Sequence, residues 1–216
     1  MNFAVIDAGL VVKLLLLLLV GMGPKLALVP FLEKTKHFDA LTQRAVGRRM
    51  VVTAVVTAIV LFATGWLLLR MLHISGGAVA VGGAIVLAIL AINMTTGPAQ
   101  KVEQVVEIRE ERTPEQIAVY PLAVPYLLNP VGVTILIIAS GEIVSVASAA
   151  LVLGLVLLVG AADYLVFANI DTLSKRLNPV SLVISEVVFG ILLTAVAVQL
   201  TVYGLGELGI ISAATH

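Results

Sequence analysis

Six long apolar stretches divide the chain, and shorter segments rich in polar and charged residues separate them. The stretches cover residues of about 8–32, 50–69, 74–95, 118–140, 143–168 and 180–204. A helix needs about 20 mostly apolar residues to cross the roughly 30 Å hydrocarbon core of a bilayer. Each stretch meets this length, so the pattern predicts an all-helical polytopic membrane protein with six transmembrane helices.

The composition supports an integral membrane protein. Hydrophobic residues make up 60% of the 216 positions and charged residues only 12%, whereas an ordinary soluble domain has about 25% charged residues. Lys and Arg together number 13, as do Asp and Glu, which gives no basic excess for nucleic-acid binding. We therefore expect the lipid bilayer as a partner and no nucleic acid, and the sequence leaves formation of a homo-oligomer open.

Lys and Arg residues are distributed unevenly between alternate loops. Ten of them fall within residues 34–49, 96–117 and 170–179, whereas Arg70 alone lies in the loops of the opposite side. Loops rich in Lys and Arg stay in the cytoplasm. The distribution predicts that both termini face away from the cytoplasm.

An outside amino terminus and three spans per half together predict two inverted three-helix repeats. The first repeat would cover residues 1–98 and the second residues 114–216, joined by a cytoplasmic linker at 99–113. At the junction of the linker and the second repeat, the Thr113-Pro114-Glu115-Gln116 sequence has the spacing of a capping box. We therefore expect the fourth span to begin as a helix at residue 114, and Asn178-Pro179 to begin the sixth span in the same way.

Equal spacing between unusual residues gives weak support to such a duplication. Gly23-Pro24 and Asn129-Pro130 are 106 residues apart, and so are Asn93 and Gln199. Proline inside a transmembrane helix frees a carbonyl group that protein or water must satisfy. We expect helices 1 and 4 to be broken or kinked at these prolines, either with no binding role or at a midplane binding site.

Three charged residues lie in the cytoplasmic halves of their predicted spans: Lys25, Asp163 and Glu186. A lone charge at such a depth costs at least about 2.5 kcal/mol. We therefore expect Lys25 to pair with Glu186 or Asp163, which leaves the other carboxylate to titrate. A structural ion pair and a relay for H⁺ or Na⁺ are both consistent with this pattern.

Catalytic and metal-binding motifs are missing from the sequence. It contains no H-E-x-x-H, G-x-S-x-G or Walker-type glycine sequence, and it has no cysteine. We expect no enzymatic activity, no metal site and no cofactor.

Two segments carry a resemblance to a known family. The run from His73 to Ala78, which leads into Gly83, and the run from Ile117 to Pro125, which leads to Asn129-Pro130, are similar to the entries to spans 3 and 4 in the MarC family of bacterial inner-membrane proteins. The similarity extends over nearly the whole chain. The family belongs with the LysE-like transporters, and some members are linked with transport of small neutral amino acids such as glycine and alanine.

The resemblance implies a location in the bacterial inner membrane. Two elements depart from the family pattern. Gly23-Pro24-Lys25-Leu26 stands where the family commonly has N-P-x-G, and Asn129-Pro130-Val131-Gly132 stands where it has a G-P-G-like sequence. Lys25 could therefore attract a substrate carboxylate or neutralise Glu186.

The leading hypothesis is a secondary transporter or exporter of a small polar metabolite, such as a small neutral amino acid, that works by alternating access coupled to H⁺ or Na⁺. Its substrate site would contain Gly23, Pro24, Asn93, Asn129, Pro130 and Gln199. The coupling charges would be Lys25, Asp163 and Glu186. The alternatives are a membrane scaffold or accessory subunit that transports nothing, and an intramembrane enzyme based on Asp163 and Glu186.

Overall fold

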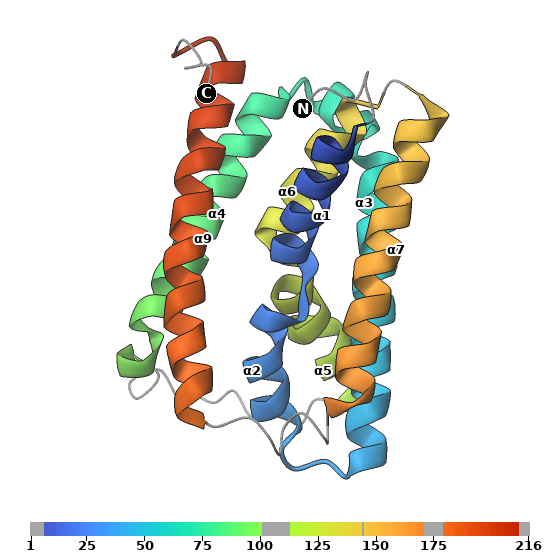
Figure 1. Ribbon diagram of the computed structural model, residues 1–216, viewed down its shortest axis with the longest axis vertical. Coiled ribbons are helices and arrows are strands. Elements are labelled where there is room, and N and C mark those ends of the chain that lie inside the picture. Colours follow the sequence, from blue (N-terminus) through green and yellow to red (C-terminus); the bar gives the residue numbers. More distant parts are fainter. Residues whose placement is uncertain (1–6, 101–112, 144, 171–178, 212–216) are drawn as a thin grey trace.

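The computed structural model of the chain describes residues 7–100, 113–143, 145–170 and 179–211, without the side chains of 97–100, 179–183, 185 and 186. Within these ranges all regular structure is helical (Figure 1). Five helical spans are long and apolar enough to cross a membrane, and a sixth is formed if a sharply bent pair of helical segments is counted as one span. The predicted all-helical fold with six spans is confirmed.

The first span is broken where the sequence predicts. Helix α1 (Ala8–Met22) ends before Gly23, and α2 (Pro24–Thr35) begins directly after it. Gly23 has an extended backbone, with φ of −81° and ψ of 162°. Pro24 takes the first position of α2, where its missing N–H group costs no helical hydrogen bond.

The fourth span is also broken, and more strongly. It consists of α5 (Pro114–Ile117), the irregular segment η1 (Ala118–Leu127) and α6 (Pro130–Gly141). A capping box formed by Thr113 and Gln116 starts α5, as the sequence predicts. The direction of the chain changes by 70° between the part that ends at Leu127 and α6.

Four unbroken helices surround the two broken spans. They are α3 (Ala40–Leu72), α4 (Gly76–Gln100), α7 (Val146–Ala168) and α9 (Pro179–Glu207). The Asp39 carboxylate caps α3, and the Thr42 hydroxyl that donates to it holds the pKa of Asp39 below its usual value. The sixth span begins at Pro179, as predicted, while Asn178 lies outside the described residues.

Helices from the two halves of the chain pack against one another. The broken spans meet through α1 and α6, α3 packs against α7, and α4 packs extensively against α9 (Figure 1). A second apolar cluster that includes Leu26, Leu87, Ile135 and Leu193 joins the α4–α9 pair to the broken helices. Helix α6 also packs against α3 and α4, and the inverted repeat stays a prediction. Most of the expected linker, residues 101–112, lies outside the described ranges.

Candidate functional site

The two broken spans cross with their backbones in contact. A Cβ atom built on Gly21 would lie 2.5 Å from the Gly132 Cα, and one built on Gly132 would overlap the Gly21 carbonyl oxygen. Only glycine at both positions allows this approach. The crossing therefore brings the break after Met22 next to the start of α6.

Asn129 fills the space between the two breaks. Its side-chain Nδ2 donates to the Val20 carbonyl at 2.6 Å, and its backbone N–H donates to the Gly21 carbonyl at 2.9 Å. In an unbroken helix these carbonyls would accept from residues 24 and 25, but Pro24 has no N–H. Asn129 thus replaces the donors that the break in the first span removes.

The same side chain also caps its own helix. Asn129 Oδ1 accepts from the backbone N–H groups of Val131 at 2.9 Å and Gly132 at 3.3 Å. Asn129 is fully buried, at 0% exposure, and Gly23 is buried as well. In this conformation the amide that the sequence assigns to substrate binding is engaged with protein on both sides.

Asp163 lies on the face of α7 that packs against α3. Three residues before it, a Cβ on Gly160 would overlap the Val55 side chain, and four residues after it, Phe167 lies 3.1 Å from a Cβ built on Gly47 of α3. Asp163 is 0% exposed, and neither of its carboxylate oxygens has a hydrogen-bond partner among the described residues. An ionised carboxylate in such a place is costly unless a proton or a cation neutralises it.

Lys25, the second charge of the predicted set, does not pair with Asp163. Lys25 is exposed, and its Nζ lies 4.8 Å from the centroid of the Phe189 ring on α9. No hydrogen bond joins Lys25 to Asp163. The side chain of Glu186 lies outside the described residues, so a Lys25–Glu186 pair stays a prediction.

Asn93 and Gln199 do not join Asn129 in this conformation. Asn93 on α4 and Gln199 on α9 are both exposed, whereas Asn129 is completely buried. Pro24 and Pro130 are partly buried and start α2 and α6. The structure therefore brings together Gly23, Pro24, Asn129 and Pro130, and it leaves the two predicted amides of the third and sixth spans outside that group.

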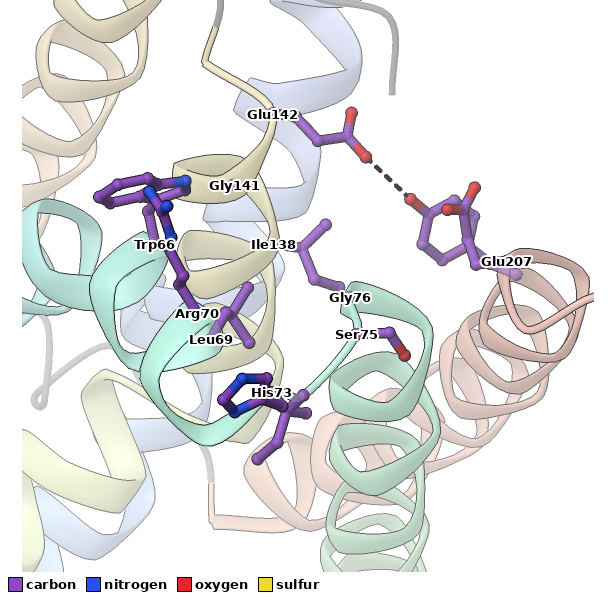
Figure 2. Close-up of a pocket in the computed structure, with 12 residues that line it drawn as sticks. Trp66, Leu69, Arg70, His73, Ser75, Gly76, Ile138, Gly141, Glu142 and Glu207 are labelled. Carbon is purple, nitrogen blue, oxygen red and sulfur yellow. Dashed lines mark hydrogen bonds between the residues drawn. The ribbon is translucent and has the colours of Figure 1, made fainter.

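Sequence reasoning missed a cavity of about 700 Å³ at the other end of α6. Its lining includes Trp66, Arg70, Glu142, Tyr203 and Glu207 (Figure 2). These residues come from the ends of three spans that are distant in sequence, so no local motif marks them. The only signal was Arg70, which stands alone among loops that otherwise lack Lys and Arg.

A known family of membrane proteins matches most of the chain. The profile described as "MarC family integral membrane protein" matches residues 9–208, which include both breaks and the cavity. This chain belongs to the MarC family. The match confirms the family to which the span 3 and span 4 motifs point.

Relatives of this MarC protein occur in bacteria and archaea, and they carry the name UPF0056 membrane protein. The relative from Methanocaldococcus jannaschii is 26% identical over 85% of this chain and 90% of its own length. The one from Pyrococcus abyssi is 25% identical over 93% and 98%, respectively. The one from Aquifex aeolicus is 26% identical over 92% and 94%. No solved structure matches the chain.

Proposed function

We propose that this MarC protein is a secondary transporter of a small polar metabolite, most simply a small neutral amino acid, by alternating access coupled to H⁺ or Na⁺. Broken helices that meet in the middle of a membrane protein are the usual binding device of such transporters. Here the observation that carries the proposal is the crossing at Asn129, where polar groups from two breaks face each other.

The groups at this crossing suit a zwitterion. An ammonium group can donate to the Val20 and Gly21 carbonyls in place of Asn129, because both carbonyls lack helical donors. A carboxylate can accept from the N–H groups of Val131 and Gly132 in place of Asn129 Oδ1, since a helix amino terminus favours anions. The bare glycine backbones leave room only for a small substrate. Binding would require α1 and α6 to separate, because Asn129 is closed off here.

Asp163 is the coupling group in this proposal. It is completely buried without a hydrogen-bond partner among the described residues, so it needs a proton or a cation whenever the bundle is closed. Separation of α7 from α3 would expose it and allow the neutralising ion to leave. In the proposed topology the protein lies in the inner membrane with both termini outside the cytoplasm. Asn93 and Gln199 then enter the substrate path only in another conformation.

The test is uptake by proteoliposomes that contain the purified protein. Labelled glycine or alanine is supplied under an inward H⁺ or Na⁺ gradient, with the wild type, Asn129→Ala and the control Asn169→Ala. Asn169 is an exposed asparagine whose side chain donates to the Leu165 carbonyl of the preceding helical turn. We expect the wild type and Asn169→Ala to accumulate substrate and Asn129→Ala to lose uptake while it stays folded in detergent.

A scaffold or accessory subunit is the second candidate, and the closed crossing favours it. Asn129 has partners for its amide nitrogen, its amide oxygen and its backbone N–H, all within the protein. A purely structural asparagine needs nothing more. Absence of uptake under both gradients by folded wild-type protein would contradict the transporter and leave this second role.

A further inference from the structure

The cavity at the far end of α6 is separate from the proposed transport site. Ile138 and Gly141 line it, whereas Asn129 lies at the opposite end of the same helix. The 12 residues of α6, at 1.5 Å per residue, place the two sites about 18 Å apart. The cavity of about 700 Å³ is open to its surroundings, because Trp66, Arg70 and Glu207 in its lining are exposed.

Opposite charges occupy opposite walls of this cavity. Arg70, near the end of α3, lies on the same wall as Trp66, and Glu142 and Glu207 lie across the opening from it (Figure 2). The Tyr203 hydroxyl on α9 donates to Glu142 Oε1 at 3.2 Å. One wall therefore presents a guanidinium group and the other presents two carboxylates and a phenol.

Neighbouring side chains hold charged groups on both walls in place. The Arg70 guanidinium carbon lies 5.2 Å from the centroid of the Trp66 ring, a contact that holds a guanidinium group and leaves its edge available for a carboxylate. On the other wall, the Tyr203 bond ties Glu142 to α9, which also carries Glu207. Leu69 and Ile138 supply apolar surface in the same cavity.

We propose that this cavity is a second binding site, for a small zwitterionic solute with an apolar side chain. The solute carboxylate binds Arg70, its ammonium group binds between Glu142 and Glu207, and its side chain packs against Leu69 and Ile138. A simple cation would leave Arg70 without a partner, and a simple anion would face two carboxylates. The site rests on the cavity and its charges alone, and it does not require that the protein transports anything.

Trp66 provides a direct test, because it is the only tryptophan in the chain and lines the cavity. Its fluorescence is measured on the full-length protein in detergent during titration with three probes of matched side chain. Leucine carries both charges, isopentylamine only the ammonium group and 4-methylpentanoate only the carboxylate. We expect a saturable change with leucine at a concentration at least about tenfold lower than with either probe of single charge, since one hydrogen bond to a charged group accounts for such a factor.

Charge-neutral variants test which wall binds the carboxylate of the solute and which wall binds its ammonium group. Arg70→Gln should reduce leucine affinity to that of isopentylamine, and Glu207→Gln should reduce it toward that of 4-methylpentanoate. Glu115→Gln is the matched control, because it removes one negative charge from an exposed residue outside the cavity. Calorimetric titration of the same variants provides a readout that does not depend on the neighbourhood of Trp66.

Two results would overturn the proposal. Equal affinity for leucine and isopentylamine, unchanged by Arg70→Gln, would show a site for cations instead of zwitterions. Absence of a saturable response to any probe, by fluorescence and by calorimetry, would show that the cavity binds none of them. Uptake by the same protein in proteoliposomes would still decide the transporter proposal, so the failure of one proposal is distinguishable from the failure of the other.

Discussion

At the scale of single residues, Asn129 and Asp163 are both buried and polar, but they differ in their hydrogen-bond partners. The buried Asn129 side chain donates to the Val20 carbonyl of the first span and accepts from two N–H groups of its own helix, and the Asn129 backbone N–H donates to the Gly21 carbonyl. Asp163 is a buried polar side chain with no hydrogen-bond partner among the described residues. The first stabilises one closed conformation, and in the proposed transporter the second is neutralised by a proton or a cation.

Replacement of Asp163 tests whether its ionisation couples substrate transport to an ion gradient. Asp163→Asn keeps the size of the side chain and removes its ability to ionise, so we expect folded yield close to that of the wild type. Uptake driven by an H⁺ or Na⁺ gradient should be lost, while exchange of labelled for unlabelled substrate across the liposome membrane should persist. Asp7→Asn, at an exposed residue before α1, is the control. Unchanged gradient-driven uptake in Asp163→Asn would contradict the coupling role.

The sequence predicted the helix breaks and the buried carboxylate, but it did not predict which residues contact them. Proline in an apolar stretch identifies a break, and a carboxylate in a span identifies an unusual burial, because both conclusions depend only on local chemistry. The bond from Asn129 to Val20 joins residues 109 positions apart, and no local pattern contains that information. The exposure of Asn93, Gln199 and Lys25 likewise depends on how whole helices are rotated.

At the scale of elements, close approach between helices depends on glycine at a few crossings. Gly21 and Gly132 place α1 against α6, and Gly77 and Gly204 place α4 against α9, with a Cβ on Gly204 only 2.7 Å from the Gly77 carbonyl oxygen. The sequence predicted the spans, the two breaks and the capped start of α5 because hydropathy, proline and capping residues act locally. The irregular backbone of η1, with extended Tyr120 and Val124, was not predicted.

Gly132→Ala tests the crossing of the broken helices. The added methyl group would overlap the Gly21 carbonyl oxygen and lie 2.8 Å from the Gly21 carbonyl carbon. Overpacking of this kind costs about 1–3 kcal/mol, which outweighs the roughly 1 kcal/mol that alanine gains over glycine inside a helix. We expect a lower midpoint of thermal unfolding, measured by circular dichroism in detergent.

Gly154→Ala is the control for this measurement. Gly154 lies inside α7, and a Cβ built there meets nothing within 4 Å. The same substitution should leave the midpoint unchanged or raise it slightly, because only helix propensity changes. A Gly132→Ala protein as stable as Gly154→Ala would show that the two backbones are not in contact.

At the scale of the whole molecule, α1 begins and α9 ends at the same end of the bundle, which is also the end that holds the cavity (Figure 1). The loop between α2 and α3 lies at the opposite end and contains Lys36. The uneven distribution of Lys and Arg predicts that this second end faces the cytoplasm. The proposed zwitterion site would then open to the outside.

Single cysteines test this orientation cleanly, because the natural chain contains none. Ser75→Cys and Lys36→Cys introduce one exposed thiol at each end of the bundle. In intact spheroplasts a membrane-impermeant maleimide should label Ser75→Cys, and it should label Lys36→Cys only after the membrane is permeabilised. The reverse pattern would invert the topology and place the cavity on the cytoplasmic side.

The bonds that Asn129 makes to both broken spans affect how readily the two helices can separate without a ligand. If α1 and α6 part without a ligand, the Val20 and Gly21 carbonyls, the Asn129 amide and the first N–H groups of α6 all lose their partners in one step. Each unsatisfied group inside a bilayer costs several kcal/mol, so an empty opening is heavily penalised. In the proposed transporter, a solute that supplies both donors and acceptors would remove that penalty, so the passage of ions without a bound solute would be suppressed.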